Sequence, residues 1–158
     1  MLFLLLAQNY IFAQEDAAPS GTKSPFELFW PLTAGKTIDD PLYFLKSIKE
    51  NLRGILIFGV AQKADYAVLI GTKRVLEAEK LLNQGKRDMA DKTLGLALEQ
   101  FNIAEKNTDN LKEKGEKLGQ AASTMQPRLD NLINFLPTLR LDKSDEVLQK
   151  IKLLRNKL

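Results

Sequence analysis

The residues able to do chemistry in this chain are carboxylates, amines and hydroxyls, because its 158 residues include no cysteine and no histidine. Without cysteine the chain can form no disulfide, thiolate nucleophile or sulfur-ligated metal site. Without histidine it lacks the commonest general base and the commonest transition-metal ligand. No phosphate-binding loop, dinucleotide-binding glycine pattern, nucleophile elbow or EF-hand loop occurs. We therefore expect a protein that is not an enzyme, with no catalytic residue, no cofactor and no metal site.

Pairs of acidic residues are the remaining candidates for acid–base or metal chemistry: Asp39 with Asp40, Asp88 with Asp91, and Glu77 with Glu105. The first pair precedes a predicted helix, where an aspartate caps free N–H groups. The second pair lies in the first turn of another predicted helix, where negative charge is stabilised. A carboxylate di-metal bundle needs a Glu-x-x-His motif, which a chain without histidine excludes. The first two pairs are therefore interpreted as structural.

Four aromatic residues are candidates for an interaction site, namely Phe26, Phe29, Trp30 and Tyr43. The first three cluster in the segment PFELFWPL. This segment is either a short turn or helix that covers one end of a bundle, or an aromatic plug for a partner or a lipid surface. The usual burial of such rings favours the first interpretation. The Tyr43 ring is either buried with its hydroxyl bonded to a neighbouring helix, or a recognition residue.

The N-terminal residues 1–13 are interpreted as a signal peptide, since they are apolar, uncharged and too short to span a bilayer, which takes about 20 residues. They lack the usual basic flank, so the signal is either atypical or truncated. A retained anchor or an apolar helix docked on the core are the alternatives. Residues 14–38 are rich in Pro, Gly and Ser and predict a flexible linker that contains the aromatic segment. These features favour an extracytoplasmic protein, secreted or in the cell envelope, with membrane contact only through its N-terminal segment.

The elements that position the candidate residues are predicted helices within a domain of residues 39–158. The first begins after an Asp40 cap with Pro41 at its first position, and Leu42, Leu45, Ile48 and Leu52 share one face. GILIFGV then continues this helix or forms a buried connector. A second helix is expected over 61–83, with its stop at Gly85. The short connection makes the third helix antiparallel to the second.

A sustained heptad pattern runs through the third helix and beyond it. Apolar residues or Gly occupy thirteen of the fourteen seam positions between Ala90 and Leu136, and Thr108 is the exception. The pattern predicts a coiled-coil seam, with residues 87–123 as one helix of about 55 Å. Pro127 is expected to break or kink it near Ser123, and Pro137 to end the next segment. A last helix over 143–156 completes an all-α fold, an antiparallel helical hairpin or bundle with one long heptad-patterned helix.

Several of these residues carry a family resemblance. Pro41-Leu42-Tyr43, Leu45-Lys46, Glu77-Ala78-Glu79 and Gly85-Lys86 resemble the pattern of a bacterial extracytoplasmic family, domain of unknown function 5667. The sequence departs from that pattern at GILIFGVAQKAD, where members usually have an acidic turn. The resemblance implies export and an all-α body, and it implies no activity and no functional residues.

The overall balance of residues restricts the class of partner. The net charge is only +3, and the basic residues are interspersed with acids rather than grouped in a stripe, so we expect no nucleic-acid partner. A structural or protein–protein interaction module is the favoured function, with an envelope protein as partner or self-association along the seam of residues 108–136. A binding module for an apolar ligand or lipid is the alternative, with the bundle interior or the PFELFW segment as its site.

Overall fold

The computed structural model describes residues 24–158, which fold into helices and contain no strand. In chain order the helices are α1 (Pro25–Phe29), α2 (Tyr43–Ile55), α3 (Val60–Asn83), α4 (Arg87–Glu113), α5 (Gln120–Leu139) and α6 (Ser144–Asn156). The predicted all-α class is confirmed. None of these helices combines the length and the apolar character needed to cross a membrane. The predicted signal peptide and the first part of the predicted linker lie outside the described residues.

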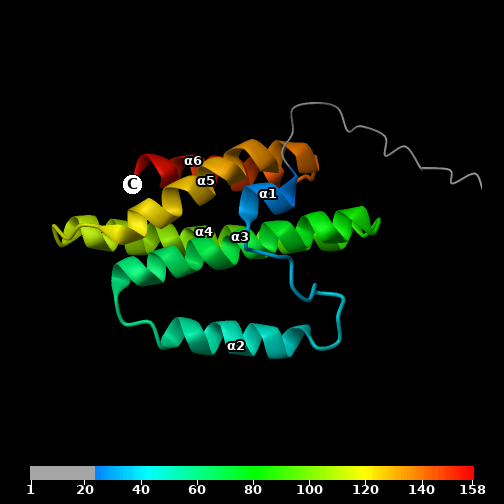
Figure 1. Ribbon diagram of the computed structural model, residues 1–158, viewed down its shortest axis with the longest axis horizontal. Helices are drawn as coiled ribbons and strands as arrows, with labels where there is room; N and C mark the ends of the chain where they lie inside the picture. Colours follow the sequence, from blue (N-terminus) through cyan, green and yellow to red (C-terminus); the bar gives the residue numbers. More distant parts are fainter. Residues whose placement is uncertain (1–23) are drawn as a thin grey trace, which may run out of the picture.

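Two antiparallel hairpins stack to form a four-helix bundle (Figure 1). The α3–α4 hairpin forms one layer and the α5–α6 hairpin the other, with α3 packed on α5 and α4 on α6. The connection between α4 and α5 therefore crosses from one corner of the bundle to the opposite one. The core comes from α3 to α6 together with Phe29 of α1.

Glycines with positive φ end both α3 and α4. After α3, Gly85 has φ 75° and the Lys86 N–H donates to the Leu81 carbonyl at 2.9 Å. After α4, Gly115 has φ 67° and the Glu116 N–H donates to the Leu111 carbonyl at 2.9 Å. Both are Schellman ends, which need a residue without a Cβ at the left-handed position. The predicted stop at Gly85 is confirmed.

The prediction of one long helix over residues 87–123 is wrong, because the second glycine end reverses the chain at Gly115. The heptad positions on each side of this turn still face the core. Those from Ala90 to Leu111 are all buried on α4, and Met125, Leu129, Leu132 and Leu136 are buried on α5. Thr108 is accommodated because its hydroxyl donates to the Ala104 carbonyl at 2.9 Å. Eleven of the fourteen seam positions are buried in the bundle, whereas Gly115, Leu118 and Ala122, at the turn and the start of α5, are not. Self-association along residues 108–136 stays a prediction.

Contrary to the prediction, neither proline interrupts α5. The helix begins at Gln120, continues through Pro127 and Pro137 and ends at Leu139, where Arg140 takes a left-handed conformation. Each proline removes one backbone hydrogen bond. Both lie on the exposed side of the helix, where water can reach a carbonyl that has lost its partner. Of the predicted break or kink near Ser123, the break is therefore wrong, and the predicted end at Pro137 is wrong as well.

A short helix lies within the stretch that was predicted to be a linker. Ser24 caps α1 through a reciprocal capping box with Glu27. Phe29 is 3% exposed and meets the Phe135 ring of α5 edge to face, with 5.5 Å between ring centroids. The Asn131 amide also donates to the Leu28 carbonyl at 2.6 Å. Residues 25–29 are thus part of the packed structure.

Candidate functional site

Helix α2 is the element that stands outside the bundle (Figure 1). Its principal contact is with α3, and none of its residues is buried. It begins at Tyr43 rather than at Pro41, since the Asp40 carboxylate accepts the Leu42 N–H at 2.7 Å in a preceding turn. Ion pairs of Lys86 with Asp39 and, at 2.9 Å, of Lys36 with Asp40 hold that turn beside the end of α3. The connector after α2 is exposed at Leu56 and Phe58, not buried.

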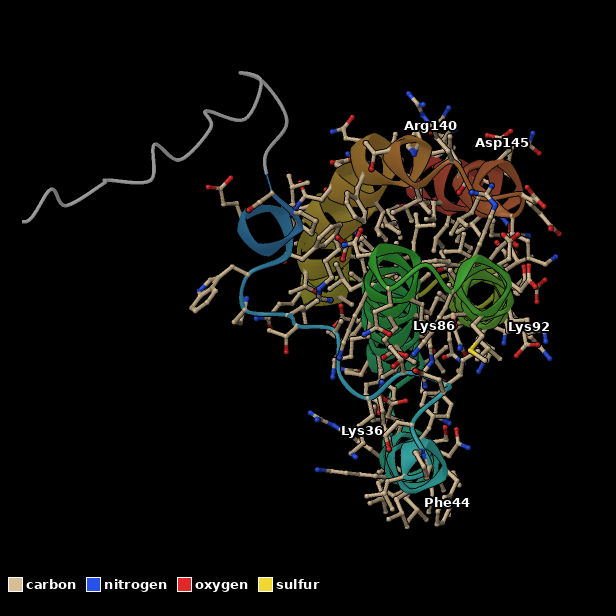
Figure 2. The ribbon with its side chains drawn as sticks, turned by 90° about the vertical axis from the view of Figure 1, so that its right-hand side faces the viewer. Lys36, Phe44, Lys86, Lys92, Arg140 and Asp145 are labelled. Atoms are coloured by element: carbon tan, nitrogen blue, oxygen red, sulfur yellow. The ribbon has the colours of Figure 1, made fainter. Side chains whose placement is uncertain are left out.

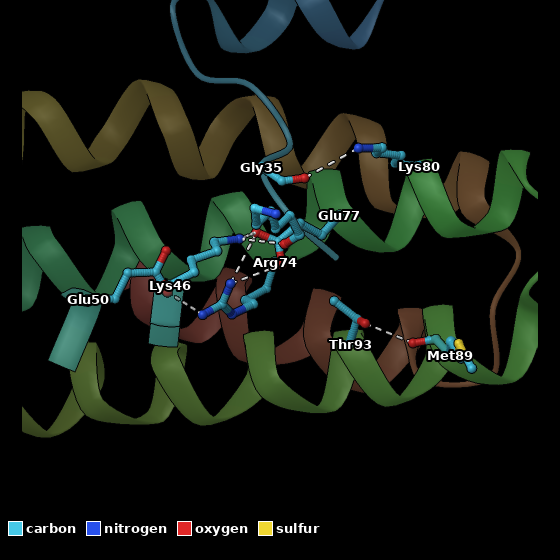
Figure 3. A network of polar contacts seen from close by, with 9 residues as sticks. Gly35, Lys46, Glu50, Arg74, Glu77, Lys80, Met89 and Thr93 are labelled. Carbon is cyan, nitrogen blue, oxygen red and sulfur yellow. Dashed lines mark hydrogen bonds and ion pairs between the residues drawn. The ribbon is translucent and has the colours of Figure 1, made fainter. Parts of the chain in front are cut away.

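The contact between α2 and α3 is a cluster of four charged residues, which we call the ion cluster: Lys46 and Glu50 of α2 with Arg74 and Glu77 of α3 (Figure 3). The Arg74 Nη1 donates to both carboxylate oxygens of Glu77, at 3.1 and 2.9 Å. Its Nη2 pairs with Glu50, and the Lys46 Nζ pairs with Glu77. The Glu77 side chain is fully buried. Two cations thus face two carboxylates, and the cluster is neutral overall.

Aromatic rings enclose the ion cluster on two sides. The Tyr43 ring centroid lies 5.2 Å from the Arg74 guanidinium carbon and 5.4 Å from Lys46 Nζ, within the range of a cation–π contact. The Tyr66 hydroxyl donates to the Glu50 carbonyl at 3.0 Å. Burial raises the pKa of the Tyr43 hydroxyl. Burial also lowers the pKa of Lys46, although Glu77 opposes that shift.

These contacts determine what the ion cluster can do chemically. Burial opposes the charge of Arg74, but Glu77 and Glu50 raise its pKa, so the guanidinium stays charged. Each carboxylate accepts at least one hydrogen bond from a cation. The geometry is that of an ion pair network that fixes one helix on another. Among residues 24–158 no group of three or more acidic side chains is arranged to hold a metal ion.

Because the polar side of α2 faces α3, its apolar side faces outward. We call this surface the outer apolar face; it comprises Leu42, Phe44, Leu45, Ile48, Leu52, Ile55, Leu56 and Phe58. Their side chains are at least 48% exposed, and Phe58 reaches 89%. Figure 2 shows Phe44 at the far edge of the molecule, on the side of α2 away from the bundle. The prediction that four of these residues share a face is confirmed, and the structure turns that face away from the core.

Open grooves run along both sides of α2. One, of about 530 Å³, lies between α2 and α3 and is lined by five cationic side chains, Lys36, Lys46, Lys49, Arg53 and Lys73, with Glu50 as the one acid. Its apolar lining includes Leu42, Leu45 and Leu69. We call it the basic groove. The other, of about 760 Å³, extends to α4 and is lined by neutral and mixed side chains, among them Ser47, Asn51 and Gln100.

The structure does not bring the four predicted aromatic residues together. Phe29 is buried against α5, and Trp30, at the end of α1, is 67% exposed. The Phe26 side chain lies outside what the structure describes. Tyr43 packs against the ion cluster on α3. The aromatic segment of α1 and the Tyr43 region of α2 are thus separate surfaces.

Sequence reasoning missed the ion cluster. The sequence does contain a signal for this cluster. Arg74 and Glu77 lie beside the apolar Val75 and Ala78 on the buried side of α3, where charged side chains need partners. The matching signal in α2 is the spacing of Tyr43, Lys46 and Glu50, which puts all three on one helical face.

Comparison with known proteins identifies a family. The family model described as domain of unknown function (DUF5667) matches residues 35–137, from the turn before α2 to near the end of α5. No curated protein and no solved structure matches the chain.

Proposed function

The chain belongs to the family of domain of unknown function (DUF5667), which specifies no activity, and we propose from its own geometry that it is a non-enzymatic helical docking module. In this proposal the four-helix bundle is a rigid support and α2 is the docking element. Its place of action is outside the cytoplasm, in the cell envelope or secreted. The support for that location is the apolar segment of residues 1–13.

The observation that carries the proposal is the outer apolar face of α2. Soluble monomers rarely expose contiguous apolar patches larger than a few hundred Å². Here eight large apolar side chains lie side by side along a single helix and the connector after it. Covering such a surface with a partner lowers the free energy, because apolar side chains are removed from water.

The absence of enzymatic activity is supported by the chemistry of the α2–α3 contact. A catalytic carboxylate needs a pKa matched to its task and must lie within hydrogen-bond reach of the proton that it moves. In the ion cluster the buried Glu77 instead binds both Arg74 and Lys46. The cluster contributes to function by holding α2 in one orientation.

A photoreactive amino acid placed at residue 52 tests the proposal in living cells. Leu52 is 57% exposed on the outer apolar face, and Leu153 of α6, at 54% exposed, is the matched control position. We expect covalent adducts from position 52 at several times the yield from position 153. An adduct with a protein, a lipid or a second copy each supports docking through α2. Background yields at both positions would remove the proposal.

A further inference from the structure

We propose that the partner covering α2 is the surface of an anionic lipid bilayer. The outer apolar face enters the boundary between headgroups and acyl chains, and Lys49, Arg53 and Lys73 of the basic groove bind the headgroup phosphates. This inference rests on the proposed function, in which α2 is the docking element.

The shape of the outer apolar face fits a bilayer. It is a convex ridge at the rim of the molecule, and nothing from the bundle rises beside it (Figure 2). The 13 residues of α2 give it a length of about 20 Å, which is too short to cross a hydrocarbon core of roughly 30 Å. A helix of this length with one apolar side lies in the plane of the interface. The apolar surface also continues past the helix end through Leu56 and Phe58, so it is broader than a narrow helix–helix seam.

The charges beside this face favour a negatively charged partner. Lys49, Arg53 and Lys73 line the basic groove and form no ion pair within residues 24–158. The one acid of the groove, Glu50, is already paired with Arg74. Lys49 is exposed at the edge of the outer apolar face, where its stem can lie along that face and its charged end can reach the headgroups. Arg53 is exposed in the groove itself, with its guanidinium carbon 5.6 Å from the centroid of the Tyr66 ring.

The apolar and basic surfaces are continuous, which distinguishes a lipid from a soluble anion. Leu42 and Leu45 belong to the outer apolar face and also line the basic groove. A headgroup bound in the groove would therefore place its acyl chains against leucines. A free phosphate would use the cations and leave that apolar lining exposed to water.

A second copy of the chain fits the surface less well. The exposed half of α2 carries only positive charge, at Lys49 and Arg53, since Glu50 faces α3. A second copy would bring cations to cations without an acid between them.

Co-sedimentation of the full chain with lipid vesicles tests the inference. We expect binding to vesicles of phosphatidylcholine with about one-third phosphatidylglycerol to be at least about tenfold tighter than to phosphatidylcholine alone, and to weaken about tenfold in roughly 0.5 M NaCl. About 10 mM inorganic phosphate should compete only weakly, because the apolar contact is not displaced. Equal binding to both vesicle types, or full competition by phosphate, would overturn the inference.

Two variants separate the apolar and the charged contributions. Ile48→Ser with Leu52→Ser shortens the outer apolar face, and Lys49→Glu with Arg53→Glu reverses the charge at its edge. Each pair should lower the affinity for anionic vesicles by about tenfold or more. The matched control, Lys152→Glu with Leu153→Ser on the exposed side of α6, should change it less than about twofold. All variants retain residues 1–13, so any affinity of that segment is the same throughout.

The outcomes distinguish this inference from the proposed function. Because the substituted side chains are exposed, the variants should keep the helical circular dichroism of the parent. If α2 variants and parent bind vesicles equally while position 52 crosslinks to a protein or a second copy, docking through α2 stands and the lipid assignment fails. If α2 variants and parent bind vesicles equally and position 52 gives only background adducts, docking through α2 and the lipid assignment both fail.

Discussion

At the scale of single residues, the buried charges of α3 determine how α2 lies. Arg74 is 6% exposed and Glu77 is 0% exposed, and both face the contact with α2. Leaving such groups without partners costs several kcal/mol, so the helix above them must present opposite charges. Lys46 and Glu50 do so only when the polar side of α2 faces inward. The outward direction of the apolar side follows from that requirement.

Substitution of Glu77 tests this account. In Glu77→Gln the Arg74 guanidinium stays buried and loses its bidentate carboxylate. We expect the free energy of unfolding, measured by urea denaturation, to fall by about 3–5 kcal/mol. The control Glu79→Gln, two residues along α3, keeps an acceptor for the Asn83 amide and should change it by less than about 0.5 kcal/mol. Equal effects at both positions would show that the ion cluster does not stabilise the α2–α3 contact.

At the scale of the helix, α2 is joined to the molecule by polar contacts rather than by burial. The bundle helices bury apolar side chains in a common core, whereas α2 contributes none to it. Elements with little buried apolar surface open more readily than the rest of a protein. The core of the bundle therefore does not depend on α2.

Amide hydrogen exchange measures that difference. We expect the amides of α2 to exchange at least about a hundredfold faster than those in the middle of α3 and α4, because only a local opening is needed to expose them. Protection of α2 equal to that of the bundle would contradict the prediction. If anionic vesicles bind as proposed, their addition should slow exchange in α2 and leave α4 unchanged.

At the scale of the whole molecule, the bundle is complete without α2. Its buried apolar residues come from α3, α4, α5 and α6, from Phe29 of α1 and from Leu141 between the last two helices. Ion pairs between helices reinforce it, for example Asp65 of α3 with Arg128 of α5 at 2.7 Å and Glu105 of α4 with Lys150 of α6 at 2.7 Å. The described residues thus form a four-helix bundle that carries the exposed amphipathic helix α2.

Replacement of residues 42–58 by a Gly/Ser linker of the same length tests the independence of the bundle. We expect the product to unfold in a single cooperative thermal transition, because no buried apolar residue is removed. The helical signal in its far-ultraviolet circular dichroism should decrease only by the contribution of the 13 residues of α2. A broad, non-cooperative transition would show that α2 is part of the folding unit.

Much of this architecture could be predicted from local sequence patterns. The ends of α3 and the position of α6 were predicted within a residue or so, since a glycine after α3 and apolar spacing within each helix act locally. The errors lie where local signals have two meanings. Gly115 lies inside the single helix predicted over residues 87–123, yet with φ 67° it ends a helix. Pro137 was interpreted as a helix end, yet it lies within α5.

The sequence by itself determined that the chain is helical, that it lacks cysteine and histidine, and that α2 has one apolar and one polar side. Periodicity defines these properties because it depends only on neighbouring residues. Only the tertiary structure decided that the heptad seam folds back into a bundle and that the apolar side of α2 points outward. Periodicity identifies a face but not what the face contacts. In α2 that contact is settled by charges on another helix, Arg74 and Glu77, which come within reach only once the chain has folded.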